Sequence, residues 1–335
     1  MKKSLIALAA AGAFAAPAFA ATSNVDVYGK LHLSVNSVDD QASNVSDLGI
    51  SSNASRIGFK GSEDLGGGLA AIWQIETTVN LDEGNASNLA SRNSFIGLKG
   101  GFGTALVGRH DTPLKLVGRS LDLFGDTMAD SRNVLGGGGD TRANNAVAYV
   151  SPSFSGLTLM GAYATDVTAN GAAAPDVDDR SVYSLSATYA NGPLYLGLGY
   201  ADGDGLEAAN IDRHWRLGAG FTVMGDLKLV AQYDDIKADT GNNDYDAWMI
   251  GAAYTMGNIV LKANYMDGDR DGTSNDPKQW TIGADYNLSK RTTVYALYAD
   301  GEYISVGSGA GASDQYGVSA GGDVSIFSIG MTHTF

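Results

Sequence analysis

Residues 193–200, "PLYLGLGY", alternate between two sets of side chains. In an extended chain, three leucines and Tyr200 would share one face, while Tyr195 and two glycines would share the other. Alternation with a period of two predicts a β-strand with one apolar face. The pattern returns in "DLKLVAQY" at 226–233 and in "NIVLKANY" at 258–265. The sequence therefore predicts an all-β protein.

Segments of this kind recur along the whole chain, and we count sixteen. They lie near 25–36, 54–63, 68–80, 91–100, 103–110, 143–151, 156–165, 181–190, 193–201, 212–221, 226–234, 245–255, 258–266, 278–286, 291–299 and 323–335. Tight turns rich in Gly, Asn and Ser alternate with long polar loops, which we place at 37–53, 81–90, 111–142, 166–180, 202–211, 235–244, 267–277 and 300–322. Short turns on one rim and long loops on the other are typical of an antiparallel transmembrane β-barrel.

Aromatic residues test this interpretation independently. They stand near strand ends on both rims: Tyr163, Tyr200, Tyr233 and Tyr265 at the long-loop rim, and Tyr149, Tyr189, Phe221, Tyr254, Tyr286 and Phe335 at the short-turn rim. Two rings of amphipathic side chains suit the two interfaces between lipid and water. Core tyrosines of a soluble β protein would explain their number but not their placement at both ends.

The last strand is expected to pair with the first, which closes the barrel and removes both edges.

The chain begins with the pattern of a secretory signal peptide. Residues 1–20 combine Lys2 and Lys3, an apolar run and a small-x-small cleavage site, so we expect export and cleavage after Ala20. Residues 21–335 would then form one barrel domain. Loss of the leader removes two lysines and no acid, so the formal charge falls from −15 to −17, which argues against nucleic acid as a partner. The chain has no Cys and hence no disulfide or thiolate site.

Residues 111–142, here called loop three, interrupt the alternation. The stretch "LKLVGRSLDLFGDTMAD" at 114–130 spaces its apolar residues more like a helical turn than a strand. A stretch of about thirty residues without a strand is unusual in a compact β domain unless it is functional or disordered. Its backbone could not face lipid unpaired. We therefore expect it to fold into the barrel and to place Asp122, Asp126 and Asp130 toward the lumen.

If leucines and tyrosines face lipid, the positions between them face the interior. The candidate interior cations, contributed by several strands, are Lys30, Arg56, Arg92, Arg109 and Arg142. The facing of Arg92 is the least certain, because both registers of its strand have mixed polarity. A barrel of sixteen strands encloses a water-filled channel, and charges facing each other across it would set its selectivity.

The chain resembles the trimeric general porins of Gram-negative outer membranes, of the neisserial and comamonad type. The resemblance runs over the whole mature chain, is strongest in its first half, and rests on "VDVYGKL", "SRIGFKGSEDLGGGLAAIWQIE", "RNSFIGLKGGFGTALVGRHDTP", "LDLFGDT", "NNAVAYVSPSFSGL" and the terminal "THTF". It implies a sixteen-stranded homotrimer in the cell outer membrane, with loop three folded into each pore. It also implies that Arg56, Arg92 and Arg142 line the constriction, opposite Asp122 and Asp126.

The expected function is passive diffusion of ions and small hydrophilic solutes, with no cofactor, no metal and no chemical step. The four histidines, His32, His110, His214 and His333, match no catalytic or zinc motif, so an enzyme is disfavoured. A substrate-specific channel and a surface barrel or adhesin remain alternatives. Nearby arginines favour a weak preference for anions, because acidic outer loops lie beyond the screening length, but the three loop aspartates oppose it.

Overall fold

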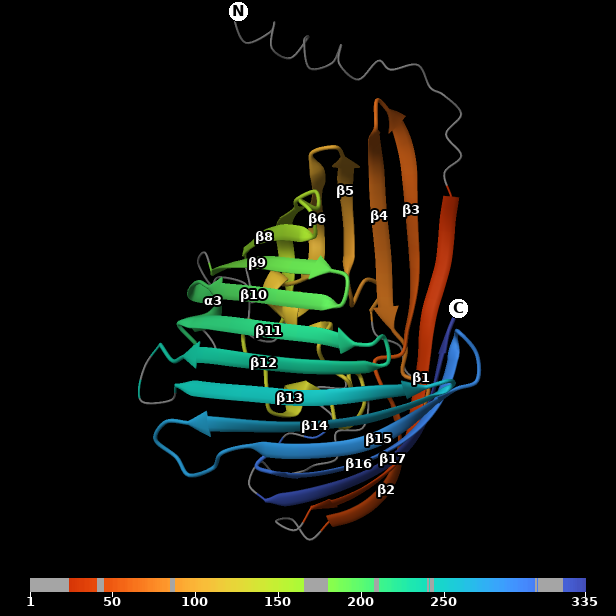
Figure 1. Cartoon of the computed structure of the whole chain (residues 1–335). Coiled ribbons are helices and arrows are strands. Elements are labelled where there is room, and N and C mark those ends of the chain that lie inside the picture. The colour runs from red at the N-terminus through yellow and green to blue at the C-terminus, as the bar shows by residue number, and fades with distance from the viewer. Residues whose placement is uncertain are drawn as a thin grey trace, which may run out of the picture.

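The computed structural model describes residues 24–40, 45–84, 88–165, 180–207, 211–239, 241, 244–304, 306 and 322–335. These residues form one closed antiparallel sheet, seen in Figure 1 as strands that wrap around a central space. The strands are β1 (Asn24–Asp40), β2 (Val45–Ser52), β3 (Arg56–Gly66), β4 (Leu69–Thr78), β5 (Ser94–Gly100), β6 (Gly103–Asp111), β7 (Arg142–Val150), β8 (Leu157–Thr165), β9 (Ser181–Asn191), β10 (Leu194–Asp202), β11 (Arg213–Val223), β12 (Leu227–Lys237), β13 (Tyr245–Met256), β14 (Ile259–Arg270), β15 (Lys278–Asn287), β16 (Thr292–Glu302) and β17 (Asp323–Thr334). The helices are α2 (Pro113–Arg119), α3 (Asp204–Glu207) and the 3-10 turn η1 (Ser131–Asn133). No helix in these ranges is long and apolar enough to cross a membrane.

The seventeen segments make a barrel of sixteen strands, as predicted, because β2 and β3 are two halves of one strand. They pair with successive parts of β1: Leu33 to Asp40 pair with β2, and Asn24 to Lys30 pair with β3. The break between the halves contains Ala54, whose φ of 48° is left-handed. A short kink in this strand thus redirects the chain without opening the sheet.

Pairing of β1 with β17 closes the barrel, which confirms the expected contact between first and last strands. The register runs from Lys30 opposite Thr334 to Asp40 opposite Val324. The backbones of Gly29 and Phe335 exchange two hydrogen bonds of 3.1 Å. Neither sheet edge of the described chain is therefore left open at this seam.

The first long loop differs from the prediction. Residues 37–53 were expected to be a polar loop, but β1 continues to Asp40 and β2 already begins at Val45. Both sides of a strand can be polar where it extends beyond an apolar layer, so alternation does not reveal it there. The predicted leader with its cleavage site, and most of the predicted loops 166–180 and 300–322, lie outside the described residues.

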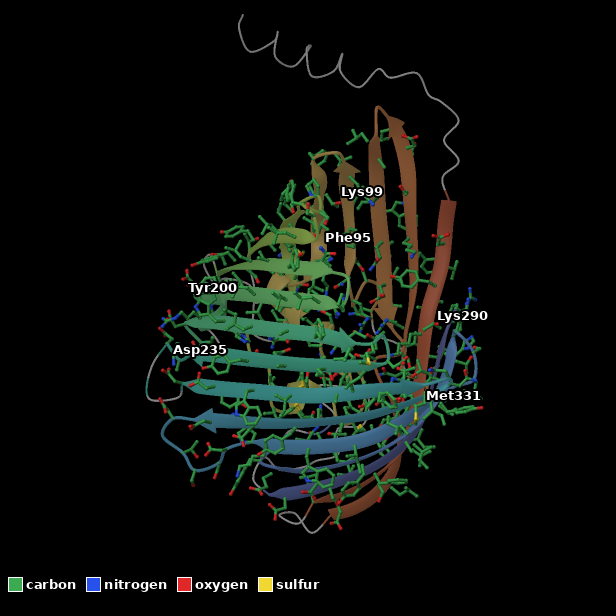
Figure 2. All side chains as sticks on the ribbon, viewed as in Figure 1. Phe95, Lys99, Tyr200, Asp235, Lys290 and Met331 are labelled. Carbon is green, nitrogen blue, oxygen red and sulfur yellow. The ribbon has the colours of Figure 1, made fainter. Side chains whose placement is uncertain are left out.

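The outward face is apolar over most of its height. Leu217, Ile250 and Ile282 are each more than half exposed, as residues facing lipid would be. At the long-loop rim the aromatic ring is fuller than predicted, because β9, β11, β13 and β15 add Tyr183, Trp215, Trp248 and Trp280, and β16 adds Tyr298. Figure 2 labels Tyr200 and Asp235 at this rim and Lys290 at the opposite one.

Loop three folds into the barrel and packs on its inner wall, as expected. Thr112 caps α2 by accepting a hydrogen bond from the Lys115 backbone nitrogen, and Pro113 occupies its first turn. The apolar side chains Leu114, Val117, Leu121 and Phe124 are completely or almost completely buried. Leu121 and Phe124 belong to a core with residues of β1, β12 to β14, β16 and β17, and Leu114 belongs to a second core with residues of β7 to β10 and α3.

Glycines on the inner wall make room for these side chains. A Cβ atom on Gly197 would lie 2.6 Å from Val117 Cγ1, one on Gly199 would lie 3.0 Å from Leu114 Cα, and one on Gly283 would lie 2.9 Å from Phe124 Cε1. The face of β10 that carries Gly197 and Gly199 is therefore the surface on which α2 packs. A real side chain at these positions would push loop three away from the wall.

We expect Gly197→Val to loosen loop three while leaving the barrel closed. The added side chain overlaps Val117, and such overpacking costs about 1–3 kcal/mol. Tryptic cleavage after Arg119 or Arg132 in the folded protein would measure the release. Gly161→Val is the matched control, because a Cβ there would meet only Leu185 Cδ2 at 3.3 Å on the outward face. Equal resistance of loop three to trypsin in both variants would show that packing against Gly197 does not hold the loop in place.

Candidate functional site

Asp126 joins loop three to the opposite wall of the barrel. Its carboxylate accepts a hydrogen bond from Lys30 Nζ on β1 at 3.0 Å and lies 3.5 Å from an Arg56 guanidinium nitrogen on β3. Arg119 of α2 donates to the other oxygen at 2.6 Å. Asp126 has a φ of 61°, a left-handed conformation that Asp tolerates better than most residues. Lys30, Arg56 and Asp126, three of the candidate site residues, thus lie together.

Glu76 on β4 extends this group along the wall. Its carboxylate accepts a hydrogen bond from Arg92 Nε at 2.6 Å and lies 4.0 Å from Arg56 Nε. Tyr28 donates to it at 3.0 Å. Sequence reasoning missed Glu76, although the same alternation that turns Trp73 and Ile75 outward turns Glu76 inward. The wall therefore carries one carboxylate between two of the predicted arginines.

Arg142 and Arg109 lie beside this network on neighbouring strands. Arg142 donates to Asn93 Oδ1 at 2.7 Å and forms an ion pair of 3.1 Å with Asp111, which also lies 3.4 Å from Lys115 Nζ. Arg109 donates to the Ser91 carbonyl at 3.0 Å and to the Asn144 side chain. The predicted cations therefore form two groups rather than a single row.

Asp122 and Asp130 are placed differently from the prediction that all three loop aspartates face wall arginines. Asp122 is buried and accepts hydrogen bonds from Ser131 N and Oγ, at 3.0 Å and 2.9 Å. Asp130 is fully buried, caps η1, and forms ion pairs with Arg119 and Arg132 of loop three itself. The two carboxylates hold the loop in shape, because a buried acid needs nearby donors and cations.

In the ion pairs that Asp126, Glu76 and Asp130 form, the cation is more exposed than the carboxylate. Side-chain exposures are 28% for Arg119, 25% for Arg56 and 22% for Arg132, against 9% for Asp126, 10% for Glu76 and 0% for Asp130. Sequence reasoning did not consider Arg119 and Arg132, although they stand within loop three. The solvent-facing charge of the site is therefore predominantly positive.

The far end of loop three is fastened by a second buried network. Arg216 of β11 makes a bidentate contact with Asp234 of β12 at 2.8 Å and 2.7 Å, and its remaining nitrogen donates to Asp140 at 2.5 Å. Asn133 donates to Gln279 of β15 at 2.9 Å. Loop three is thus held on opposite sides of the barrel, and its charged residues have fixed positions.

The loop carboxyls have different acidities. Burial opposes ionisation of Asp126, but Lys30, Arg119 and Arg56 outweigh it and hold its pKa below the ordinary value. For Asp130, burial is outweighed by Arg132 and Arg119, which lower its pKa. Burial raises the pKa of Asp122, and the Asp130 carboxylate raises it further, to about 6. Asp122 is therefore the one of these three carboxyls that titrates near neutral pH.

A closed sixteen-stranded barrel with an apolar exterior and a charged interior defines a transmembrane β-barrel protein. Within the described ranges, no set of three or more His, Asp or Glu side chains is arranged to hold a metal ion. The family described as "Gram-negative porin" matches residues 7–305. The chain belongs to this family.

Named relatives agree with this assignment. Outer membrane porin protein 32 of Delftia acidovorans is 34% identical over 269 residues, which cover 76% of each chain. Major outer membrane protein P.IB of Neisseria meningitidis serogroup B is 34% identical over 260 residues, 74% of this chain and 75% of that one. The structure of the anion-selective porin from Comamonas acidovorans matches with a TM-score of 0.76 at 28% identity, over 93% of this chain and 100% of that one.

These findings make the protein an outer-membrane porin. The family and the named relatives are porins, which are channels rather than enzymes. The resemblance seen in the sequence, the sixteen-stranded barrel and the location in the outer membrane of a Gram-negative bacterium are confirmed.

The ratio of anion to cation permeability should increase as the pH falls through about 6. Protonation of Asp122, whose pKa is raised to about 6, removes one negative charge from loop three, whereas Asp126 and Asp130 stay ionised. Reversal potentials under a salt gradient, measured from about pH 7.5 to about pH 5, would report the change. Asp122→Asn should lack the step near pH 6. A step of the same size in that variant would assign the titration to another group.

Proposed function

We propose that the protein is a water-filled channel for passive diffusion of ions and small hydrophilic solutes, with a weak preference for anions. The observation that supports the sign is the unequal exposure of the paired charges. Arg119, Arg56 and Arg132 present their guanidiniums to the interior, while Asp126 and Asp130 are covered. A solute passing loop three would therefore approach cations more closely than anions.

Distance and screening support the same sign. Many of the acids lie on outer loops, and charges farther away than about 8–10 Å are largely screened at ordinary salt. The local set of Lys30, Arg56, Arg92, Arg109 and Arg142, with Arg119 and Arg132 of loop three, would then dominate the field. Glu76 and the loop aspartates reduce it, so the preference is weak. The similar protein from Comamonas acidovorans is described as anion-selective.

Arg56→Gln should lower the ratio of anion to cation permeability. Loss of one unit charge at about 4 Å from the path of an ion is worth about 1 kcal/mol in water, which is about fivefold. The test is single-channel recording of the purified protein in a planar bilayer under a salt gradient. Arg213→Gln is the matched control, because Arg213 also pairs with an aspartate but is 43% exposed at the long-loop rim.

Three results would count against the proposal. Equal effects of Arg56→Gln and Arg213→Gln would mean that selectivity is not set at loop three. A folded, detergent-extracted protein without channel activity would exclude the diffusion channel and favour the surface barrel or adhesin instead. A saturable current that depends on one solute would favour the substrate-specific channel.

We further propose that the protein forms a homotrimer through the face made by β1 to β6. The aromatic ring at the long-loop rim runs from Tyr163 on β8 to Tyr298 on β16. In the described parts of β1 to β6, the outward positions at this rim hold no Tyr or Trp; they include Ile50, Ile57 and Thr77. A face that is covered by protein does not need the amphipathic side chains that suit a lipid interface.

Gel electrophoresis without heating should therefore show a species of three times the monomer mass. Leu48→Lys and Ile50→Lys together should reduce that species to monomers, because both side chains point outward on β2 and are more than half exposed in the single chain. Leu196→Lys and Leu198→Lys on β10 serve as the comparison. Stable trimers of the β2 variant would place the subunit contact elsewhere.

A further inference from the structure

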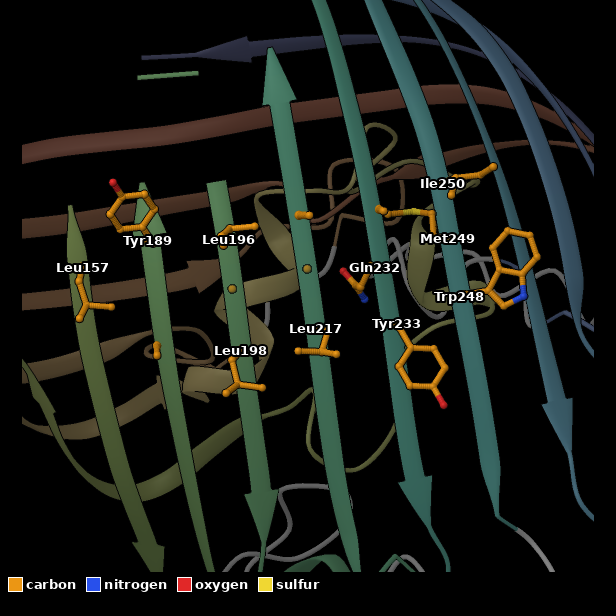
Figure 3. A pocket seen from close by; sticks show the side chains of 15 residues that line it. Leu157, Tyr189, Leu196, Leu198, Leu217, Gln232, Tyr233, Trp248, Met249 and Ile250 are labelled. Atoms are coloured by element: carbon orange, nitrogen blue, oxygen red, sulfur yellow. The ribbon is translucent and has the colours of Figure 1, made fainter. Parts of the chain in front are cut away.

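The lipid-facing wall over β8 to β13 is hollowed by a diagonal groove of about 550 Å³. Figure 3 shows its lining, with Leu157 and Tyr189 at one end and Tyr233, Trp248 and Ile250 toward the other. Leu196, Leu198 and Leu217 stand between them. The volume is within the range of about 300–1,000 Å³ found for ligand sites.

Small side chains create the groove. Ala219 of β11 and Ala231 of β12 are register partners, and both face outward, with Leu196 and Ile250 on the flanking strands. Ala187 of β9 adds a third small outward residue. The outer surface is therefore recessed at these alanines and protrudes at the leucines and Ile250.

We propose that this groove holds one acyl chain of an outer-membrane lipid in preference to the rest of the wall. The protein is located in the outer membrane, so the groove opens onto hydrocarbon. Its polar lining residue, Gln232, is buried and bonds to Asp234, so no polar group is presented to a ligand at the floor. Apolar chains are the ligands that such a surface can accept.

The length and direction of the groove fit a chain that spans part of the apolar layer. Tyr189 belongs to the short-turn rim, whereas Tyr233 and Trp248 belong to the long-loop rim, where Tyr233 donates to Asp246 at 2.7 Å. The groove thus runs between the two aromatic rings. A neighbouring subunit is not its expected occupant, because this face carries the aromatic ring that β1 to β6 lack.

Packing supplies the preference. All parts of the wall are apolar, so exclusion from water does not distinguish the groove from the surface around it. A chain lying in a groove touches atoms on its sides as well as its floor, and each additional close contact adds dispersion energy. The wall is also thin here. Gly197 and Gly218 line the groove, and on the inner side of the wall Val117 and Leu121 of loop three pack directly against these two glycines.

Two tryptophans provide a matched pair for the test. Trp248 lines the groove and Trp280 does not, yet each is 40% exposed. Each also packs on a tyrosine at a ring distance of 5.4 Å, Tyr265 for Trp248 and Tyr298 for Trp280. Two proteins would be made from the full chain, each retaining one of these residues, with the other three of the four tryptophans changed to Phe.

The proteins are reconstituted into phosphatidylcholine vesicles that contain a low, increasing fraction of lipid brominated on its acyl chains. Bromine quenches tryptophan on contact. We expect about fivefold stronger quenching of Trp248 than of Trp280 at the lowest fractions, with saturation. Equal quenching, or stronger quenching of Trp280, would overturn the proposal.

A filled groove gives a second readout. Ala231→Leu in the protein that retains Trp248 should lower its quenching to that of Trp280. Ala263→Leu, also outward and outside the groove, should leave the quenching of Trp248 unchanged. Heat-modifiable gel mobility checks that both variants are folded. Unchanged quenching after Ala231→Leu would show that the groove does not hold the lipid.

Discussion

The absence of water in the bilayer core is the constraint on which the whole structure depends. Every backbone N–H and C=O group at that depth needs a partner within the protein. The pairing of β1 with β17 meets this requirement for the barrel, down to the bonds between Gly29 and Phe335. An irregular segment can then exist at the same depth only on the inside, and loop three is such a segment.

Loop three meets the same requirement with side chains of the wall. Tyr195 donates to the Val117 carbonyl at 3.1 Å, Tyr245 donates to the Val134 carbonyl at 2.6 Å, and Asp234 accepts from the Gly136 nitrogen at 3.1 Å. Its apolar residues pack against wall glycines, and its buried acids take arginines as partners. Asp122 and Asp130 therefore stabilise the loop, and the charge left facing solvent belongs mainly to the arginines.

Alternation could predict the barrel because one face of each strand meets an apolar environment over a fixed height. The same rule places Lys30 and Arg56 inside, and it would have placed Glu76 there too. It fails at β2, where "VSDLGISS" has no consistently apolar face, so the pattern does not predict a strand over residues 45–52. Periodicity also cannot say which charges pair: the positions of Asp122 and Asp130 depend on Arg119, Arg132 and Ser131, whose arrangement is set by the fold of loop three. Local spacing contains no information on that choice.

The part of the wall formed by β10 and β11 must both pair its backbone within the sheet and leave space for the side chains of loop three. Its inward positions must be small, because Leu114, Val117 and Leu121 occupy the space beside Gly197, Gly199 and Gly218. Its outward position at Ala219 is small as well, so little more than backbone separates loop three from the membrane. Since loop three carries Arg119 and Arg132, the packing that fixes its position on this part of the wall also fixes where these two charges lie in the barrel. The position of these two charges therefore depends in part on wall glycines that carry no charge.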